Sequence, residues 1–473
     1  MHKLTINGQT ATAADNELLS DVLRRAGKAV AQPCGGRGVC GKCRVTVNGR
    51  EEPACQYRVR GDAAVTVPEP ETILAETGAR ESGVLTEHMA LALDIGTTTL
   101  ALALFSEDNG TIARTATADN PQRAYGADVM SRIGYCRAHG PAALQSAVIA
   151  AVNGLIRQLN APPVKRLYAA GNTTMLHLFF GVDCSAMGVA PYTPAFLKSQ
   201  TVPAPRLGIT GAETVLSLPC AAAFVGADLT AGLAFAGLPP QDQYNLLLDL
   251  GTNAEIVLFS RQSAVCTAAA AGPCFEGADI SCGMSASAGA IFAYAPGRVQ
   301  TVENRPAKGI CGTGLVDLIA ALLRDGTIDE NGYMPCGVFE VAPGVTLTQD
   351  DVRQYQLAKS AVCAALLTLL QKQNVSFNKI DKLCIAGGFA AGINIGSAVA
   401  AGLLPAALKE KCVCVGNSSL LGTVKYAAGQ HDLSAFLEHT AYVDLAADPL
   451  FSDLFIENLT LKENSSPISE RPV

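Results

Sequence analysis

Residues 91–105 read LALDIGTTTLALALF and residues 246–259 read LLLDLGTNAEIVLF, so one pattern occurs twice, with its aspartates, Asp94 and Asp249, 155 positions apart. Each copy predicts a buried strand, a tight glycine turn and a second strand. Turn amides and threonine hydroxyls can bind phosphate oxygens, and an aspartate at a strand end can hold hydrated Mg²⁺. A single hairpin of this kind would be weak evidence, because Asp and Gly are common in turns. Its repetition predicts two hairpins that face each other across one nucleotide site.

Several glycine-rich segments supply further candidate nucleotide contacts. Residues 309–318 read GICGTGLVDL and predict a helix start whose amides could hold a nucleotide. The pattern G-x-x-x-x-G-K-[ST] does not occur in the sequence, which excludes a Walker-type ATPase. The candidate nucleotide-binding residues from the two turns and this helix start are Gly96, Thr97, Thr98, Gly251, Thr252, Asn253, Gly312, Thr313 and Gly314.

Length, charge and composition limit the class of protein. The chain has 473 residues, 49% of them apolar, which predicts two to four globular domains. Its formal net charge is −7 and it has no cluster of Lys and Arg, so neither nucleic acid nor a membrane is expected as a partner. The N-terminus lacks an apolar signal core and no membrane helix is predicted, so we expect a cytoplasmic protein. In a reducing compartment its 16 cysteines are interpreted as thiols and metal ligands.

Four cysteines near the N-terminus form the most specific metal-ligand pattern. Cys34, Cys40, Cys43 and Cys55 follow C-x5-C-x2-C-x11-C. This spacing is close to the plant-type C-x4-C-x2-C pattern with a distant fourth ligand. Glycines between these ligands let backbone amides turn inward and donate hydrogen bonds to the sulfurs. The pattern therefore predicts one small iron–sulfur cluster.

Three alternative interpretations exist for the same loop. Structural zinc usually takes two C-x2-C knuckles, and only residues 40–43 have that form. The glycines at 36, 38 and 41 match a dinucleotide fingerprint, but they lie among the cysteines and do not open a helix after a strand. Disulfides are disfavoured by the reducing compartment.

Residues 33–47, PCGGRGVCGKCRVTV, together with Ala54-Cys55-Gln56, resemble [2Fe–2S] ferredoxin domains. The surrounding pattern agrees with a small β-grasp. Residues 4–10 predict a strand that enters an Asn-Gly hairpin, and residues 15–26 predict a short helix. Residues 65–68 predict a last strand, after which an acidic Gly-, Pro- and Ser-containing stretch is typical of a linker.

The paired hairpins resemble the superfamily of sugar kinases, heat-shock chaperone ATPases and actin (ASKHA), whose two RNase H-like halves close on ATP. Residues 227–237 resemble its first connecting helix, and the resemblance implies that Asp228 orients the attacking water or the metal. Asp228 could instead only cap or solvate that helix. With Asp94 and Asp249 it completes the predicted catalytic set.

Residues 385–390, IAGGFA, resemble the adenosine motif of the same superfamily, in which Gly387 and Gly388 let a nucleoside lie against bare backbone. A plain strand-to-helix turn is the alternative. Residues 396–404 would be the second connecting helix.

Nearly the whole chain resembles the reductive activators of corrinoid proteins, in which this ATPase type follows a [2Fe–2S] domain. The resemblance extends through residues 120–132, 170–177, 191–194 and 416–420. It implies ATP- and Mg²⁺-dependent one-electron reduction of an inactive Co(II) corrinoid to Co(I), in support of methyl transfer. The implied partners are a corrinoid protein and a ferredoxin- or flavodoxin-type reductant, and a homodimer is compatible with the family. Larger members carry an extra middle region between the ferredoxin domain and the ATPase, whereas only about twenty residues lie between the two here, so how the partner docks stays open.

The predicted fold class is α+β followed by α/β: a small β-grasp ferredoxin domain, then a duplicated RNase H-like ATPase domain. The predicted boundaries are 1–69 for the ferredoxin domain, 70–88 for a linker, 89–242 and 243–430 for the two ATPase halves, 431–461 for an extension packed on the ATPase and 462–473 for a flexible tail.

The sequence is also compatible with rival functions and with a second metal site. A small-molecule kinase of the same superfamily with an accessory ferredoxin is one rival function. Another is an activator of a radical dehydratase, which would hold a [4Fe–4S] cluster, and a third is a nucleotide-gated binding module. A second metal site at Cys266, Cys274, Cys282, Cys412 and Cys414 competes with the view that these are buried thiols. His177 is interpreted as a packed or capping histidine rather than a cobalt ligand.

Overall fold

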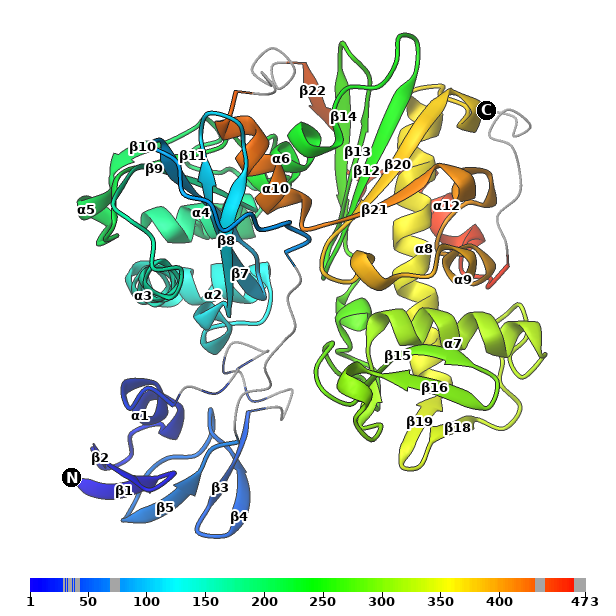
Figure 1. Ribbon diagram of the computed structural model, residues 1–473. Helices are drawn as coiled ribbons and strands as arrows, with labels where there is room; N and C mark the ends of the chain where they lie inside the picture. The colour runs from blue at the N-terminus through cyan, green and yellow to red at the C-terminus, as the bar shows by residue number, and fades with distance from the viewer. Residues whose placement is uncertain are drawn as a thin grey trace.

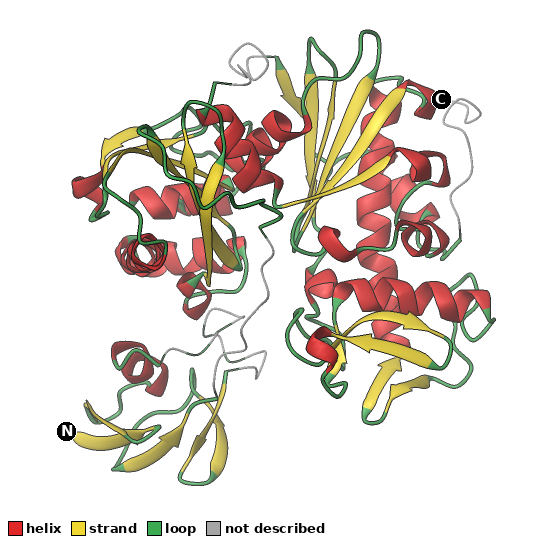
Figure 2. Cartoon of the chain, in the orientation of Figure 1, coloured by secondary structure: helices red, strands yellow, loops and turns green. Residues whose placement is uncertain are grey.

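A computed structural model describes residues 1–28, 30, 32, 36, 38, 43–68, 77–429 and 439–462. Figure 1 shows a small N-terminal module and two larger halves that lie side by side. Each half contains one large sheet with helices packed on it (Figure 2). Among the described helices, none is long and apolar enough to cross a membrane.

The N-terminal module is a five-stranded sheet covered by one helix. Its strand order is β2-β1-β5-β3-β4, and β1 and β5 are parallel, which is the β-grasp arrangement that the sequence predicts. Asn7 and Gly8, with φ of 44° and 83°, form the tight turn between the first two strands. The elements are β1 (His2–Ile6), β2 (Gln9–Ala13), α1 (Leu19–Arg25), β3 (Arg44–Val47), β4 (Arg50–Pro53) and β5 (Ala63–Thr66).

The two halves repeat one sheet topology. The strand order is β10-β11-β9-β6-β7-β8 in the first half and β21-β20-β12-β13-β14-β22 in the second. In both, three antiparallel strands are followed by a strand that pairs in parallel with the first of them. This confirms the predicted duplication. The strands are β6 (Met89–Ile95), β7 (Thr99–Ser106), β8 (Ile112–Asp119), β9 (Val164–Gly171), β10 (Thr201–Pro203), β11 (Ala212–Ser217), β12 (Tyr244–Leu250), β13 (Ala254–Phe259), β14 (Ala264–Ala269), β20 (Ile380–Ala386), β21 (Cys412–Gly416) and β22 (Thr440–Tyr442).

Helices pack on these sheets and bury two large apolar cores. The central strands are apolar on both faces, as β6 and β12 show, because helices and the other half cover them. The helices of the first half are η1 (Pro121–Ala124), α2 (Val129–His139), α3 (Ala142–Gln158), α4 (Thr173–Phe180), η2 (Ser185–Gly188), α5 (Ala204–Leu207) and α6 (Ala227–Ala236). Those of the second half are η3 (Pro273–Glu276), η4 (Val302–Asn304), α7 (Gly312–Arg324), α8 (Gln349–Lys372), η5 (Phe377–Lys379), η6 (Ala390–Gly392), α9 (Ile395–Ala400), η7 (Ala406–Lys411), α10 (Ser418–Ala427) and α12 (Pro449–Glu457).

The second half also carries an insertion and a C-terminal extension. The insertion contains a three-stranded sheet and a hairpin, made of β15 (Ala290–Ala295), β16 (Arg298–Thr301), β17 (Gly309–Ile310), β18 (Val338–Ala342) and β19 (Val345–Thr348). Helix α12 packs on the long central helix α8. The buried side chains of Lys359 and Ser360 on α8 donate hydrogen bonds to the carbonyls of Thr460 and Phe455, which hold the extension in place.

Helices α6 and α10 lie against each other between the halves (Figure 1). A Cβ at Gly422 of α10 would lie 1.7 Å from the Ala231 carbonyl oxygen of α6, so the two backbones touch directly. The sequence assigned the second connecting helix to residues 396–404, and that assignment was wrong. Helix α9 in that region packs on α7, whereas α10 is the partner of α6.

We predict that Gly422→Ala destabilises the protein because the new methyl group must separate α6 from α10. Overpacking of a tight contact costs about 1–3 kcal/mol, which would lower the melting temperature by several degrees. Gly134→Ala is the matched control, since Gly134 also lies inside a helix but a Cβ there meets nothing within 4 Å. The control should be neutral or stabilising by roughly 0.5–1 kcal/mol. Equal melting temperatures for the two variants in a thermal scan would contradict the prediction.

Candidate functional site

Asp94 stands at the end of β6 and is held by residues of the other half. Its Oδ2 accepts a hydrogen bond from Asn417 Nδ2 at 2.8 Å, and its Oδ1 accepts one from Ser419 Oγ at 2.7 Å. Asn417 is the N-cap of α10, so the start of this helix faces the first hairpin. Burial raises the pKa of Asp94, and the two hydrogen bonds oppose that shift. The carboxylate therefore joins the two halves at the predicted nucleotide site.

The first turn, Gly96 to Thr98, is braced from behind by polar side chains. Asn120 Nδ2 donates to the Gly96 carbonyl at 2.8 Å, and Asn172 Nδ2 donates to Thr97 Oγ1 at 3.3 Å. Arg132 donates to the Thr97 carbonyl at 2.5 Å. The turn carbonyls point toward these donors, so the turn is rigidly held at the end of the strand.

The second hairpin lies against the predicted adenosine motif. A Cβ at Gly387 would lie 2.9 Å from Asp249 Oδ1 and 2.5 Å from the Leu250 carbonyl oxygen, and the φ of Gly387 is 98°. Only glycine allows β20 and β12 to approach in this conformation. A Cβ at Gly388 would meet nothing within 4 Å, so its backbone borders open space. These two glycines thus have different roles, close packing for Gly387 and free backbone surface for Gly388.

Three carboxyl groups converge beside this hairpin. Glu255 lies directly opposite Asp249 in the β12–β13 ladder, and Asp228 lies in the first turn of α6. Burial, followed by the charge of Asp249, raises the pKa of Asp228 to about 7, and burial with the charge of Asp94 raises the pKa of Asp249 to about 7. Burial and the charges of Asp228 and Asp249 raise the pKa of Glu255 well above its ordinary value. Such a group of acids favours a proton or a cation among them.

Glu276 completes the second turn. Its Oε2 accepts a hydrogen bond from Thr252 Oγ1 at 3.1 Å, and the Gly251 amide donates to the Asn253 carbonyl at 2.9 Å. Burial raises the pKa of Glu276, while the Thr252 bond and the charges of Arg123 and Arg132 oppose that shift. Sequence reasoning missed Glu255 and Glu276. Glu255 could have been noticed because it is the one acidic residue in the apolar run 254–259. No local sequence pattern distinguishes Glu276.

The donor set fits hydrated Mg²⁺. Among the described residues, no group of three or more His, Cys, Asp or Glu side chains could hold a metal ion. Mg²⁺ usually keeps several waters and takes one or two carboxylates together with substrate phosphates. The partly exposed carboxylates of Asp94, Asp228 and Asp249 offer that kind of support. Which of them binds the metal is a prediction.

Helix α7 begins at Gly312, as the sequence predicts, and its glycines serve packing. A Cβ at Gly312 would lie 2.0 Å from the Phe275 carbonyl oxygen, and one at Gly314 would lie 2.1 Å from the Ile291 carbonyl oxygen. Thr313 Oγ1 donates to the Phe292 carbonyl at 3.0 Å. The hydroxyl is thus engaged within the fold, and contact of this helix start with a nucleotide remains a prediction. Phe275 stacks on Phe389, so the helix start and the adenosine motif are neighbours.

The cysteine loop is described in part. Cys43 and Cys55 are buried, 2% and 4% exposed, while Cys34 and Cys40 lie outside the described residues. Gln56 Nε2 donates to Cys55 Sγ at 3.6 Å and to the Gly36 carbonyl at 3.1 Å. A Cβ at Gly38 would lie 2.6 Å from Gln56 Cδ. Buried sulfur, an amide donor and glycine backbone fit a small iron–sulfur cluster.

The other candidate ligands do not gather into a described metal site. Burial raises the pKa of the Cys266, Cys274 and Cys412 thiols to about 12, as expected of thiols packed in apolar surroundings. His177 is fully buried and stacks on Phe196. Its Nδ1 lies 2.7 Å from the Thr173 carbonyl, and its Nε2 accepts from the Ala195 amide at 3.0 Å. Both ring nitrogens are therefore occupied within the fold.

The fold and these sites define a class of protein in which a [2Fe–2S] module precedes an ASKHA ATPase. Family models agree over nearly the whole chain. Residues 4–65 match the 2Fe-2S iron-sulfur cluster binding domain, residues 89–241 match the RACo middle region, and residues 243–470 match the C-terminal domain of RACo, the ASKHA domain. The chain belongs to the RACo-type family of reductive activators. A [2Fe–2S] cluster, ATP and Mg²⁺ are the cofactors of this class, as predicted.

Individual relatives agree with this assignment. The chain is 29% identical over 423 residues to the corrinoid activation enzyme RamQ of Eubacterium limosum, covering 79% of this chain and 70% of that protein. It is 26% identical over 371 residues to a [Co(II) methylated amine-specific corrinoid protein] reductase of Methanosarcina barkeri, covering 70% of this chain and 68% of that protein. A solved reductive activator for a corrinoid, iron-sulfur protein is 27% identical with a TM-score of 0.70, covering 98% of this chain and 99% of that one.

One expectation about the family was wrong. The sequence was interpreted as lacking a middle region, yet the model described as the RACo middle region matches residues 89–241. This is the segment that forms the first RNase H-like half. The region is therefore present as part of the two-half fold and not as a separate insert before it.

We predict that Asp249→Asn stabilises the nucleotide-free protein and abolishes its stabilisation by Mg·ATP. Asp249 faces Glu255 across the ladder, and relief of opposed like charges is worth about 0.5–1 kcal/mol, roughly 1–3 °C in melting temperature. Asp242→Asn is the matched control, because it removes the same charge from an exposed turn just before β12. An undiminished upward shift of the melting temperature with Mg·ATP in Asp249→Asn would refute the assigned role.

We also predict an acid-sensitive contribution from His177. Burial lowers its pKa below the ordinary value of 6.5, so below about pH 6.5 the unfolded chain binds a proton that the native protein does not. Stability therefore falls as the pH falls through that value, until the folded-state pKa is passed. His177→Asn should flatten this part of the curve and cost about 1–3 kcal/mol at pH 8 through lost buried hydrogen bonds. Denaturant melts between pH 5 and 8 measure both effects.

Proposed function

We propose that the protein is an ATP-dependent reductive activator that returns an inactive Co(II) corrinoid to Co(I) by transfer of one electron. The observation that carries the proposal is a carboxylate site shared by both ATPase halves in the same chain as a [2Fe–2S] module. The family and the named activities of the two curated relatives support it. Since Co(I) is required for methyl transfer, the activity would serve a corrinoid-dependent methyltransferase.

The residues of the site suggest how the nucleotide is held. The amides of the turns at Gly96 to Thr98 and Gly251 to Asn253 would bind phosphate oxygens, and the backbone at Gly388 would border the nucleoside. Asp228, Asp249 and Asp94 would orient the hydrated metal and the attacking water, which is the positioning chemistry that phosphoryl transfer needs. Glu255 lies directly opposite Asp249 in the ladder and would add to the acidic surroundings that favour a bound cation.

ATP would supply the free energy that makes the electron transfer to Co(II) favourable. A plant-type cluster supplies one electron near about −400 mV, and for one electron about 59 mV corresponds to about 1.4 kcal/mol. A conformational preference of about 5.5 kcal/mol reverses a 1:99 equilibrium and thus offsets roughly 230 mV. In this chain the Asn417 and Ser419 bonds to Asp94 join the halves where such a preference would arise.

The partners are inferred from the same proposal. The electron acceptor would be a corrinoid protein, and a ferredoxin- or flavodoxin-type protein would reduce the [2Fe–2S] module. A homodimer and a cytoplasmic location are also proposed, both from the family resemblance and the composition.

We predict that the reduced protein converts a Co(II) corrinoid protein to Co(I) only with Mg·ATP. The Co(I) absorption band measures the reaction. Cys55→Ser should lose the electron transfer but keep ATP hydrolysis. Asp249→Asn should keep the cluster but form no Co(I), even when Mg·ATP is present. Cys336→Ser, which replaces an exposed cysteine in the second half, is the matched control for Cys55→Ser. Equal Co(I) yields with and without ATP would exclude the coupling, and rapid ADP release with a metabolite would favour a kinase.

A further inference from the structure

One short segment lies between the first turn and the N-terminal module. We call residues 120–126 the bridging segment; it follows β8 and contains η1. On one side it holds the turn through two hydrogen bonds from Asn120. The side-chain Nδ2 donates to the Gly96 carbonyl at 2.8 Å, and the backbone N–H donates to the Thr98 carbonyl at 2.8 Å. The start of the bridging segment is thus tied to this turn by two hydrogen bonds.

Arg132 ties the far end of the bridging segment to the same turn. Its guanidinium donates to the Thr97 carbonyl at 2.5 Å and to the Gly126 carbonyl at 2.9 Å. The side chain is 0% exposed, and burial lowers its pKa to about 9. A buried cation is costly unless many groups surround it. Arg132 also donates to Gln122 Oε1 and Met175 Sδ. Its buried guanidinium therefore has four hydrogen-bond acceptors around it, the other two being the Thr97 and Gly126 carbonyls.

The other side of the bridging segment contacts the N-terminal module. The Arg24 guanidinium of α1 lies 4.6 Å from the centroid of the Tyr125 ring, within cation–π range. The backbone N–H of Gln32 donates to the Arg123 carbonyl at 3.2 Å. Gln32 also touches the cysteine loop, because a Cβ at Gly36 would lie 2.9 Å from its Oε1 and 4.0 Å from Cys55 Cβ. A single continuous set of contacts therefore leads from the phosphate turn to the cluster loop.

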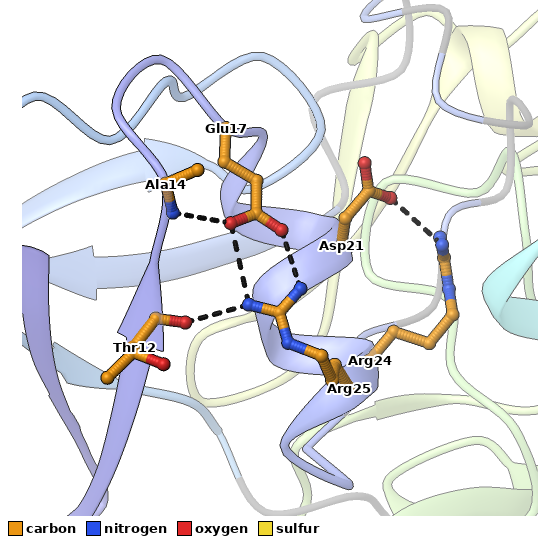
Figure 3. A network of polar contacts seen from close by, with 6 residues as sticks. All are labelled: Thr12, Ala14, Glu17, Asp21, Arg24 and Arg25. Atoms are coloured by element: carbon orange, nitrogen blue, oxygen red, sulfur yellow. Dashed lines mark hydrogen bonds and ion pairs between the residues drawn. The ribbon is translucent and has the colours of Figure 1, made fainter. Parts of the chain in front are cut away.

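Figure 3 separates the two arginines of α1 by their contacts. Arg25 is bound within the module, where it donates to Glu17 Oε1 at 2.6 Å and to the Thr12 carbonyl at 2.7 Å. Arg24 lies with Asp21 on another side of the helix (Figure 3). The Arg24 guanidinium also contacts the Tyr125 ring. Adjacent residues of the same type thus offer an interface variant and an internal control.

We propose that the bridging segment is the surface through which the first ATPase half holds the ferredoxin module, and that Arg132 is the positioning residue that connects this surface to the nucleotide turn. The inference rests on the nucleotide site of the proposed function. Phosphate bound to the turn amides pulls on the Thr97 carbonyl, and Arg132 passes the change to Gly126 and Tyr125. The ferredoxin module is then held differently in the two nucleotide states, which is the differential contact that coupling requires.

Hydrogen exchange of the reconstituted full-length protein tests this inference without a corrinoid partner. The probe is a non-hydrolysable ATP analogue with Mg²⁺. In the unmodified protein we expect changed exchange at the hairpin of residues 91–105, in the bridging segment and in α1. In Arg24→Ala and Tyr125→Ala the change at the hairpin should persist, while the change in α1 is lost. Arg25→Ala, and Tyr125→Phe, which keeps the aromatic ring, should respond as the unmodified protein does.

The outcomes separate the inference from the proposed function. A response at the hairpin without any response in α1 of the unmodified protein would overturn the coupling alone. The coupling would also be overturned if α1 of Arg24→Ala and of Tyr125→Ala showed the same change in exchange as α1 of the unmodified protein. No response at either place would overturn the nucleotide site and, with it, the inference. A failure to produce Co(I) despite the expected exchange pattern would overturn the proposed function and leave the coupling supported.

Discussion

The close contact of α6 and α10 is the constraint on which the rest of the site depends. Gly422 lets the α10 backbone reach the Ala231 carbonyl, and no larger residue leaves room for that approach. This contact fixes the start of α10 so that Asn417 and Ser419 reach Asp94 from the other half. A separation of the helices by even one methyl group would withdraw the Asn417 and Ser419 donors from the partly exposed Asp94 carboxylate, and the loss of these two hydrogen bonds would be destabilising.

The site concentrates negative charge that the fold alone does not neutralise. Burial is the largest cause of the raised pKa of Asp228, Asp249 and Glu255. The charge of Asp249 adds to the shift of Asp228, the charge of Asp94 to that of Asp249, and the charges of Asp228 and Asp249 to that of Glu255. Such an arrangement lowers the stability of the empty protein and favours a bound cation, which is the trade between stability and function common at active sites. The two arginines near Glu276 lie on the opposite half, so their charges also act across the boundary between the halves.

Much of the fold could be predicted because local patterns carried it. The continuous apolar runs around Asp94 and Asp249, the Asn-Gly turn at Asn7 and the cysteine spacing each have a local physical meaning. Glu255 was missed because its importance comes from the strand register that places it opposite Asp249. The family resemblance includes residues 416–420, but no local pattern predicts the contact of Asn417 with Asp94, because the two residues are 323 positions apart in the sequence. The second connecting helix was misplaced for the same reason, because helix packing depends on a distant partner.

The sequence by itself determined the kinds of parts: two aspartate hairpins, a cysteine loop, and the glycines that open α7 and end β20. Short-range sterics and hydrogen bonding dictate these features, so a few neighbouring residues are enough to predict them. Only the tertiary structure decided which groups meet, namely Asn417 with Asp94, Glu255 with Asp249, and Arg24 with Tyr125. The physical reason is that burial, register and the packing of distant helices set these distances, and none of the three is encoded within one segment.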